Sequence, residues 1–124
     1  MEFVEDGSVL SVLEKSNIEF TFLEQVSFCA QLASGLFHLH QEGVIHADLS
    51  LRNCLIELKT KRIAISDFGL SQCETRPRKV DAVAIRWASP ELVKTRIPTK
   101  KSDVWALGTN HTLLYISPKN VALF

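Results

Sequence analysis

A capping box followed by a long run of helical apolar spacing is the feature that most constrains the fold of this 124-residue chain. Thr21 stands where a helix N-cap belongs, and Glu24 three residues later can bond back to the N-cap backbone. Gly43 occupies the position at which helices commonly end. The pattern predicts one amphipathic helix over residues 22–41. Apolar residues recur at helical spacing along it, at Phe22, Val26, Cys29/Ala30, Ala33, Leu36/Phe37 and His40.

Shorter elements are expected around this helix. The apolar run 9–15 predicts a short helix after the Gly7-Ser8 turn, and Val44-Ile45 predicts a short strand. Two apolar or alternating runs, 54–58 and 62–65, predict a β-hairpin. Residues 1–6 read as the end of another strand.

The second half of the chain is expected to be looser. Residues 70–86 are polar and basic without periodicity and predict a long loop, and such loops are usually functional. Pro90 opens a short helix over residues 91–94. Ser102-Asp103 predicts the cap of a further helix that begins at Val104.

Composition excludes several classes of protein. Four prolines and five glycines with 46% hydrophobic residues argue against disorder. No apolar run approaches the ~18 residues of a membrane span, and the acidic first residues do not resemble a signal peptide. Three widely spaced cysteines without a C-x-x-C pair indicate a reducing cytoplasm and no disulfide framework. The basic residues are scattered with little aromatic interleaving, so no nucleic-acid partner is expected.

Two polar motifs carry chemistry. Asp48 and Asn53 lie five residues apart within the run His46–Asn53, and Asp67-Phe68-Gly69 follows the predicted hairpin. Phosphoryl transfer needs a carboxylate that orients and deprotonates the acceptor hydroxyl, and oxygen ligands that hold Mg²⁺ on the phosphates. Asp48 suits the first task, and Asn53 and Asp67 suit the second. Ala88-Ser89-Pro90-Glu91 then closes the long loop.

In this order the motifs resemble the H-R-D-L-x-x-x-N, D-F-G and A-P-E signatures of eukaryotic protein kinases. Leu51-Arg52-Asn53 and Ala84-Ile85-Arg86-Trp87 resemble protein-tyrosine kinases, most closely the non-receptor Fes/Fer-like enzymes. Ser102–Gly108 extends the resemblance over about residues 1–109, which are expected to form a partial kinase domain. Residues 110–124 are expected to be a divergent apolar tail.

The resemblance implies an α+β, protein-kinase-like fold: a truncated, mainly helical C-terminal lobe with a small β-hairpin and no N-terminal lobe. It implies ATP and Mg²⁺ as cofactors, a tyrosine in a protein or peptide as substrate, and a cytoplasmic location. The implied catalytic residues are Asp48 and Asn53, the implied metal ligands Asn53 and Asp67, and the implied ATP-binding residues Glu2, Val4, Leu55 and Asp67. Asp103 would brace the backbone of the catalytic loop.

Some features depart from the family. No G-x-G-x-x-G loop or V-A-x-K lysine precedes residues 2–4. Ala47 replaces the arginine that in the family pairs with a phosphorylated activation-loop residue, and no tyrosine occurs between Asp67 and Glu91.

Three hypotheses therefore stand. The first is a partial protein-tyrosine kinase catalytic domain. The second is a catalytically dead, pseudokinase-like module that binds or regulates a partner. The third is a metal-binding helical domain built on His38, His40 and His46.

Overall fold

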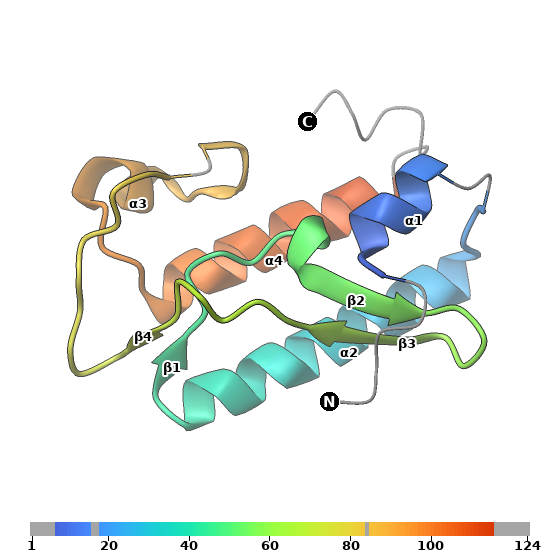
Figure 1. The fold of residues 1–124 in the computed structure, drawn as a ribbon, viewed down its shortest axis with the longest axis horizontal. Coiled ribbons are helices and arrows are strands. Elements are labelled where there is room, and N and C mark those ends of the chain that lie inside the picture. Colours follow the sequence, from blue (N-terminus) through green and yellow to red (C-terminus); the bar gives the residue numbers. More distant parts are fainter. Residues whose placement is uncertain (1–6, 16–17, 84, 116–124) are drawn as a thin grey trace.

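The computed structural model describes residues 7–15, 18–83 and 85–115, with side chains as far as residue 110. Two long helices, α2 (Phe22–Gln41) and α4 (Lys100–Tyr115), pack against each other (Figure 1). The antiparallel hairpin of β2 (Cys54–Glu57) and β3 (Arg62–Ile65) packs on α2 through β3. This mixture of helices and small antiparallel sheets confirms the predicted α+β class.

The remaining elements flank this centre. At one end, α1 (Val9–Lys15) packs against β2 and the 3₁₀ turn η1 (Leu51–Asn53). At the other end, β1 (Val44–Ile45) pairs antiparallel with β4 (Gln72–Cys73). The turn η2 (Ile85–Trp87) and α3 (Pro90–Thr95) follow, and α3 lies at the end of the molecule opposite α1 (Figure 1). The predicted helices at 9–15 and 91–94, the strand at 44–45 and the hairpin are all confirmed.

The predicted capping box forms at the start of α2. The Glu24 backbone N–H donates to Thr21 Oγ1 over 3.1 Å, and the Thr21 N–H donates to Glu24 Oε1 over 2.9 Å. Lys61 Nζ lies 3.0 Å from Glu24 Oε2, so the same carboxylate also holds the hairpin turn. The Thr21 backbone N–H, with Lys61 beside it, lowers the pKa of the Glu24 carboxyl.

The buried face of α2 matches the predicted one only in part, at Cys29 and Leu36. The buried residues are Phe28, Cys29, Leu32 and Leu36. The predicted members Phe22 and Phe37 are 68% and 60% exposed. Because β3, α4 and β1 all contact α2, the buried side is decided by where these elements dock, and apolar spacing alone does not give it.

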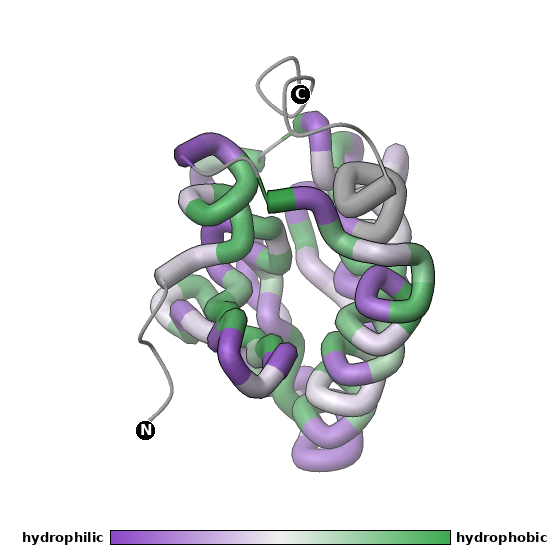
Figure 2. The backbone as a smooth tube through the Cα atoms, turned by 90° about the vertical axis from the view of Figure 1, so that its right-hand side faces the viewer, coloured by the Kyte–Doolittle hydropathy of each residue, from purple (hydrophilic) through white to green (hydrophobic). Residues whose placement is uncertain are grey.

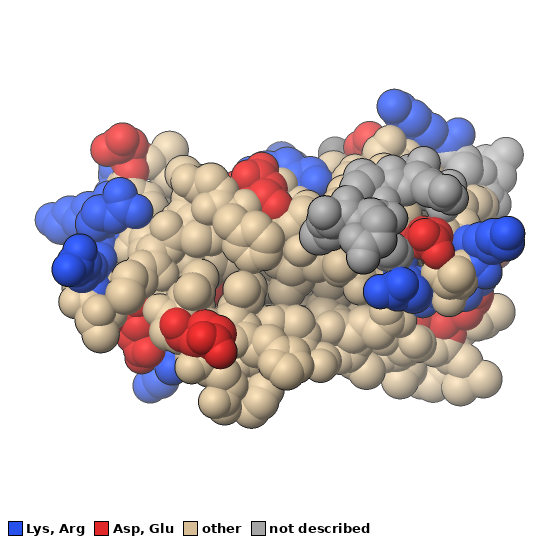
Figure 3. All heavy atoms as spheres, turned by 60° about the horizontal axis from the view of Figure 1, so that its bottom comes forward, with Lys and Arg blue, Asp and Glu red and all other residues tan. Residues whose placement is uncertain are grey.

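The core nevertheless forms one cluster. Phe20 and Phe28 meet edge to face with ring centroids 4.8 Å apart, and the fully buried Val9, Leu51 and Ile56 join them. Hydrophobic and hydrophilic segments alternate along the helical coils in Figure 2, as expected for helices with one buried face. Seen from the side of α2, lysine and arginine gather mainly toward the ends of the molecule and uncharged surface fills much of the space between (Figure 3).

Helix α4 begins at Lys100, earlier than the predicted start at Val104. Thr99 and Ser102 exchange hydrogen bonds, from the Ser102 N–H to Thr99 Oγ1 (3.1 Å) and from the Thr99 N–H to Ser102 Oγ (2.8 Å). Thr99 is therefore the N-cap residue of α4, and Ser102 is the N3 residue that bonds back to it. The predicted start of the helix was wrong because Thr99 and Ser102 both carry a hydroxyl that can cap a helix, and the sequence does not show which of them does so.

Helix α4 also continues without a break across residues 109 and 110. Asn110 is fully buried, and its Oδ1 accepts a hydrogen bond from Trp87 Nε1 over 2.9 Å. The predicted loop 70–86 contains β4 and the first two residues of η2, which its lack of periodicity did not reveal. Among the described residues, no helix combines the length and apolar content needed to cross a membrane.

Candidate functional site

The loop between β1 and β2 places two polar side chains, those of Arg52 and Asn53, against Asp48. Arg52 Nη2 donates to Asp48 Oδ1 over 3.0 Å. Asn53 Nδ2 donates to Asp48 Oδ2 over 2.9 Å and to the Asp48 carbonyl oxygen over 2.6 Å. The Asp48 side chain stays 17% exposed, so its carboxylate is oriented by two neighbours and still reachable.

Asn53 links this loop to the residues after the hairpin. The backbone N–H of Ser66 donates to the Asn53 carbonyl over 2.7 Å, which continues the β2–β3 pairing by one step beyond Cys54 and Ile65. Asp67 is the next residue, exposed and in a left-handed conformation with φ 58°. The hairpin ladder therefore brings Asn53 and Asp67 to the same edge, although 14 positions separate them in the sequence.

The donor atoms at this edge fit a hard cation. Both hydrogen bonds of the Asn53 side chain use its nitrogen, which leaves the amide oxygen for a ligand. Asp67 adds an exposed carboxylate, and the Gly69 N–H approaches its Oδ1 at 3.3 Å. Amide and carboxylate oxygens are ligands that Mg²⁺ prefers.

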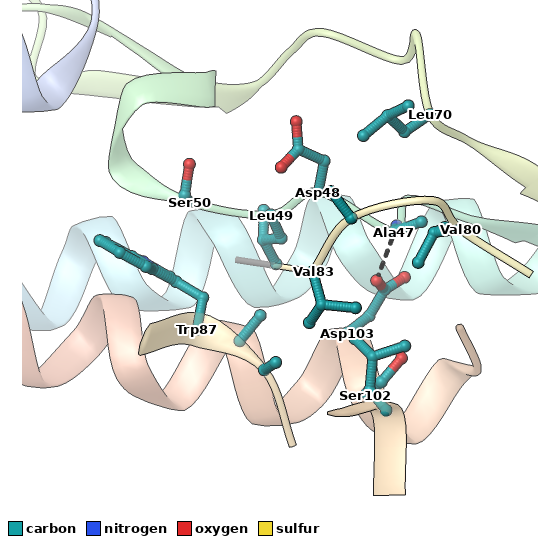
Figure 4. A pocket seen from close by; sticks show the side chains of 14 residues that line it. Ala47, Asp48, Leu49, Ser50, Leu70, Val80, Val83, Trp87, Ser102 and Asp103 are labelled. Atoms are coloured by element: carbon teal, nitrogen blue, oxygen red, sulfur yellow. Dashed lines mark hydrogen bonds between the residues drawn. The ribbon is translucent and has the colours of Figure 1, made fainter. Parts of the chain in front are cut away.

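Asp103, on α4, hydrogen-bonds to the backbone at the start of this loop. Its Oδ2 accepts a hydrogen bond from the His46 backbone N–H (2.8 Å), and its Oδ1 accepts one from the Ala47 N–H (3.0 Å; Figure 4). His40 Nε2 lies 3.0 Å from Asp103 Oδ2. Ala47 has φ 72°, an unfavourable conformation for a residue with a Cβ, and the carboxylate fixes it there. The predicted bracing contact of Asp103 is present.

A cavity that is partly open to solvent lies beside Asp48 (Figure 4). Residues 47–50 of the loop between β1 and β2 form one wall, and α4 contributes Ser102, Asp103 and Ala106. The other wall includes Val80, Ala82, Val83 and Trp87. Ser50 also lines it, and its buried hydroxyl has no hydrogen-bond partner within the described part of the chain.

The predicted site residues are distributed as follows. Asp48, Asn53 and Asp67 lie together at the open end of the hairpin. Leu55 is half-buried on β2, opposite Ala64. Glu2 and Val4 lie outside the described residues.

Sequence reasoning missed two residues of this site. Arg52 binds Asp48 as an i,i+4 pair, and that spacing was a readable signal. His40 was considered in the apolar spacing of the helix and as a candidate metal ligand, and its pairing with Asp103 has no sequence signal because 63 positions separate the two.

The metal-binding hypothesis finds no support in these side chains. His46 Nε2 lies 2.8 Å from the Ser66 carbonyl oxygen, and His40 is engaged by Asp103. Over the described ranges, no cluster of three or more His, Cys, Asp or Glu side chains could hold a metal ion. Cys29, Cys54 and Cys73 are free thiols.

Comparison with known proteins gives one consistent family. Residues 1–116 match the family model described as protein tyrosine and serine/threonine kinase. Fer-related kinase 1 of Caenorhabditis elegans is 34% identical over 110 residues, which are 87% of this chain and 27% of that protein. Tyrosine-protein kinase Fer of Rattus norvegicus is 34% identical over 87% of this chain and 14% of its own length. Ephrin type-A receptor 5 of Gallus gallus is 36% identical over 86% of this chain and 11% of its own length. The chain thus spans about a quarter or less of these relatives.

Proposed function

The chain belongs to the protein tyrosine and serine/threonine kinase family, and we propose that it serves the ATP-dependent transfer of a phosphoryl group to tyrosine in proteins. The curated relatives it matches include tyrosine kinases of the Fer type, which supports tyrosine as the acceptor. The observation that carries the proposal is the Asp48 carboxylate, fixed by Arg52 and Asn53 beside an open cavity.

In this proposal Asp48 is the base. Its Oδ1 and Oδ2 each accept one hydrogen bond, so the carboxylate keeps lone pairs with which to accept the proton of a tyrosine hydroxyl. Protein kinases place a catalytic-loop aspartate in this role, because phosphoryl transfer depends on positioning and electrostatic stabilisation. The cavity next to Asp48 would receive the acceptor segment.

Asn53 and Asp67 would hold Mg²⁺ through the amide and carboxylate oxygens. The bound ion would neutralise charge on the ATP phosphates. Leu55, half-buried on β2, would form the floor under adenine, and Glu2 and Val4 would contribute hinge contacts. A cytoplasmic location is part of the same proposal, and three free thiols are consistent with a reducing compartment.

The test is phosphorylation of a tyrosine peptide with Mg-ATP by the purified full-length protein and by an Asp48→Asn variant. Loss of the base should lower kcat by about 10²- to 10⁴-fold. Glu42→Gln, which removes an exposed carboxylate just past the end of α2, is the matched control and should leave the rate unchanged. Equal rates for wild type and Asp48→Asn would refute the assignment.

A second candidate is a non-catalytic, pseudokinase-like binding module. Ala47 favours it, because this loop position offers no guanidinium to a phosphorylated partner segment. The two candidates separate in one measurement series. A module without catalysis would bind nucleotide or a partner and transfer no phosphate even as wild type. A kinase would transfer phosphate as wild type and as Glu42→Gln, and would lose the transfer in Asp48→Asn.

A further inference from the structure

The residues after Asp67-Phe68-Gly69 contain a loop that one side chain closes. Gln72 on β4 is 6% exposed. Its Nε2 donates to the Arg78 carbonyl oxygen over 2.9 Å, and its Oε1 accepts a hydrogen bond from the Arg78 N–H over 2.9 Å. The side-chain amide thus pairs with the backbone in both directions, as one strand pairs with another. Residues 73–77 form the closed loop.

Gln72 is itself anchored to the strand that leads into the catalytic loop. On β1, Ile45 is its register partner. On either side of Gln72, the Ser71 hydroxyl donates to the His46 carbonyl over 3.3 Å and the Glu74 N–H donates to the Gly43 carbonyl over 2.7 Å. The position of Arg78 is therefore tied to the backbone immediately before Asp48.

Residues 78–83, called the wall below, continue from this contact along one side of the cavity next to Asp48. Val80, Ala82 and Val83 line that cavity. The wall has a second attachment at Arg96, whose carbonyl accepts from the Val80 N–H (2.8 Å) and whose Nη1 donates to the Asp81 carbonyl (2.8 Å). Arg96 ties the wall to the end of α3. Gln72 ties it to the catalytic loop.

The Gln72 attachment is uncharged. The nearby side chains that could bind an added phosphate, those of Arg76, Arg78 and Lys79, are exposed, and Ala47 on the catalytic loop carries no charge. The neutral amide of Gln72 needs no phosphate to hold Arg78. A pair of hydrogen bonds between uncharged groups is also insensitive to salt, unlike an exposed ion pair.

We propose that Gln72 is the positioning residue that sets the 78–83 wall against Asp48, so that the acceptor side of the site is ordered without phosphorylation of this segment. The idea that this wall borders a groove for the acceptor rests on the proposed function. The idea that Gln72 orders residues 78–83 is independent of it.

The first test is residue-level amide hydrogen exchange on the full chain with Gln72→Leu, which keeps the side chain's bulk and removes both hydrogen bonds. Exchange at the Arg78 amide should rise about tenfold or more, with residues 79–83 following, while the amides of α2 stay within twofold. Tryptic cleavage after Arg78 and Lys79 should rise with it. Gln72→Glu keeps the acceptor for the Arg78 N–H and loses the donor, so it should lie between wild type and Gln72→Leu.

The chain offers a matched control in Gln31 on α2. Its Nε2 donates to the Lys61 carbonyl and its Oε1 accepts from the Ile63 N–H, each over 3.0 Å, which is the same bidentate pairing at the hairpin. Gln31→Leu should accelerate exchange at Ile63 and leave Arg78 unchanged. Equal acceleration at Arg78 in both variants, or none in Gln72→Leu, would overturn the proposal. Should Gln72→Leu not fold, Gln72→Glu decides by the same criterion.

A kinetic arm separates this inference from the proposed function. In the full-length protein, Gln72→Leu should raise the KM for a tyrosine peptide several-fold and leave the KM for ATP unchanged. Faster exchange at Arg78 in a protein that transfers no phosphate even as wild type would support the Gln72 assignment and refute the proposed function. Phosphate transfer by the wild type, together with unchanged exchange at the Arg78 amide in Gln72→Leu, would support the proposed function and refute the Gln72 assignment.

Discussion

His40 and Asp103 meet across 63 residues of sequence, with the His40 Nε2 3.0 Å from the Asp103 Oδ2. Asp103 is 2% exposed, and the two backbone N–H groups of His46 and Ala47 complete its set of partners. One buried carboxylate thereby joins α2, α4 and the start of the loop between β1 and β2. A buried charge is tolerated only when it is hydrogen-bonded in this way.

Asp103→Ala should therefore be among the most destabilising single substitutions in α4. It leaves two backbone N–H groups without their acceptor and removes the brace on the left-handed Ala47. We expect a loss of about 3 kcal/mol in the free energy of unfolding, measured by urea denaturation. Val104→Ala, at the adjacent position, which is 56% exposed, should change it by less than about 0.5 kcal/mol. Similar losses in the two variants would contradict the bracing role.

Two glycines should respond to the same substitution with opposite signs. Gly43 has φ 71° and open space where a Cβ would be, so Gly43→Ala should cost about 1 kcal/mol through backbone strain alone. Gly108 lies inside α4 with no such φ and equally open space, so Gly108→Ala should add about 0.5–1 kcal/mol of stability. Thermal or urea unfolding of the pair measures this, and a shift of the same sign in both would show the argument to be wrong.

The elements that could be predicted from the sequence are those whose signals are local. The capping box at Thr21 and Glu24 and the alternation in 54–58 and 62–65 depend on neighbours within a few residues, and α2 and the hairpin formed where they predicted. The buried face of α2 could not be predicted, because it depends on where β3 and α4 dock. Phe22 and Phe37 are exposed for that reason.

The candidate site shows the same division. Asp48, Asn53 and Asp67 stand in short motifs, and the hairpin ladder brings them together. Contacts that join distant segments have no such signal: the pairing of His40 with Asp103 and the contact of Gln72 with Arg78 depend on the folded arrangement. From the sequence alone, a glutamine in a polar segment such as Gln72 is expected to be exposed to solvent, and only the structure shows that it is buried.

Two of the three thiols, those of Cys73 and Cys54, should differ sharply in reactivity. Hydrogen bonds from the Thr75 hydroxyl and backbone lower the pKa of the exposed Cys73, with Arg76 adding to the effect. Burial raises the pKa of Cys54 to about 12. Because the thiolate is the nucleophile, iodoacetamide at pH 7 should label Cys73 at least about tenfold faster than Cys54, as read by mass spectrometry of the native protein. Thr75→Ala should slow labelling of Cys73 at pH 7 and not at pH 10. Unchanged labelling at pH 7 would exclude a role for the hydroxyl.

The capping box should give the chain a defined acid sensitivity. In the folded state the pKa of Glu24 lies below its ordinary value of about 4.5, chiefly because the Thr21 backbone N–H donates to the carboxylate. A carboxyl group with a lowered folded-state pKa contributes stability that is complete above the unfolded value and disappears as the pH falls through the folded value. Urea unfolding between pH 7 and pH 3 should therefore show a steeper loss below about pH 4.5 in the wild type than in Glu24→Gln. Glutamine keeps the acceptor of the capping box and cannot titrate. Parallel curves for the two proteins would mean that the carboxylate charge at this cap does not contribute.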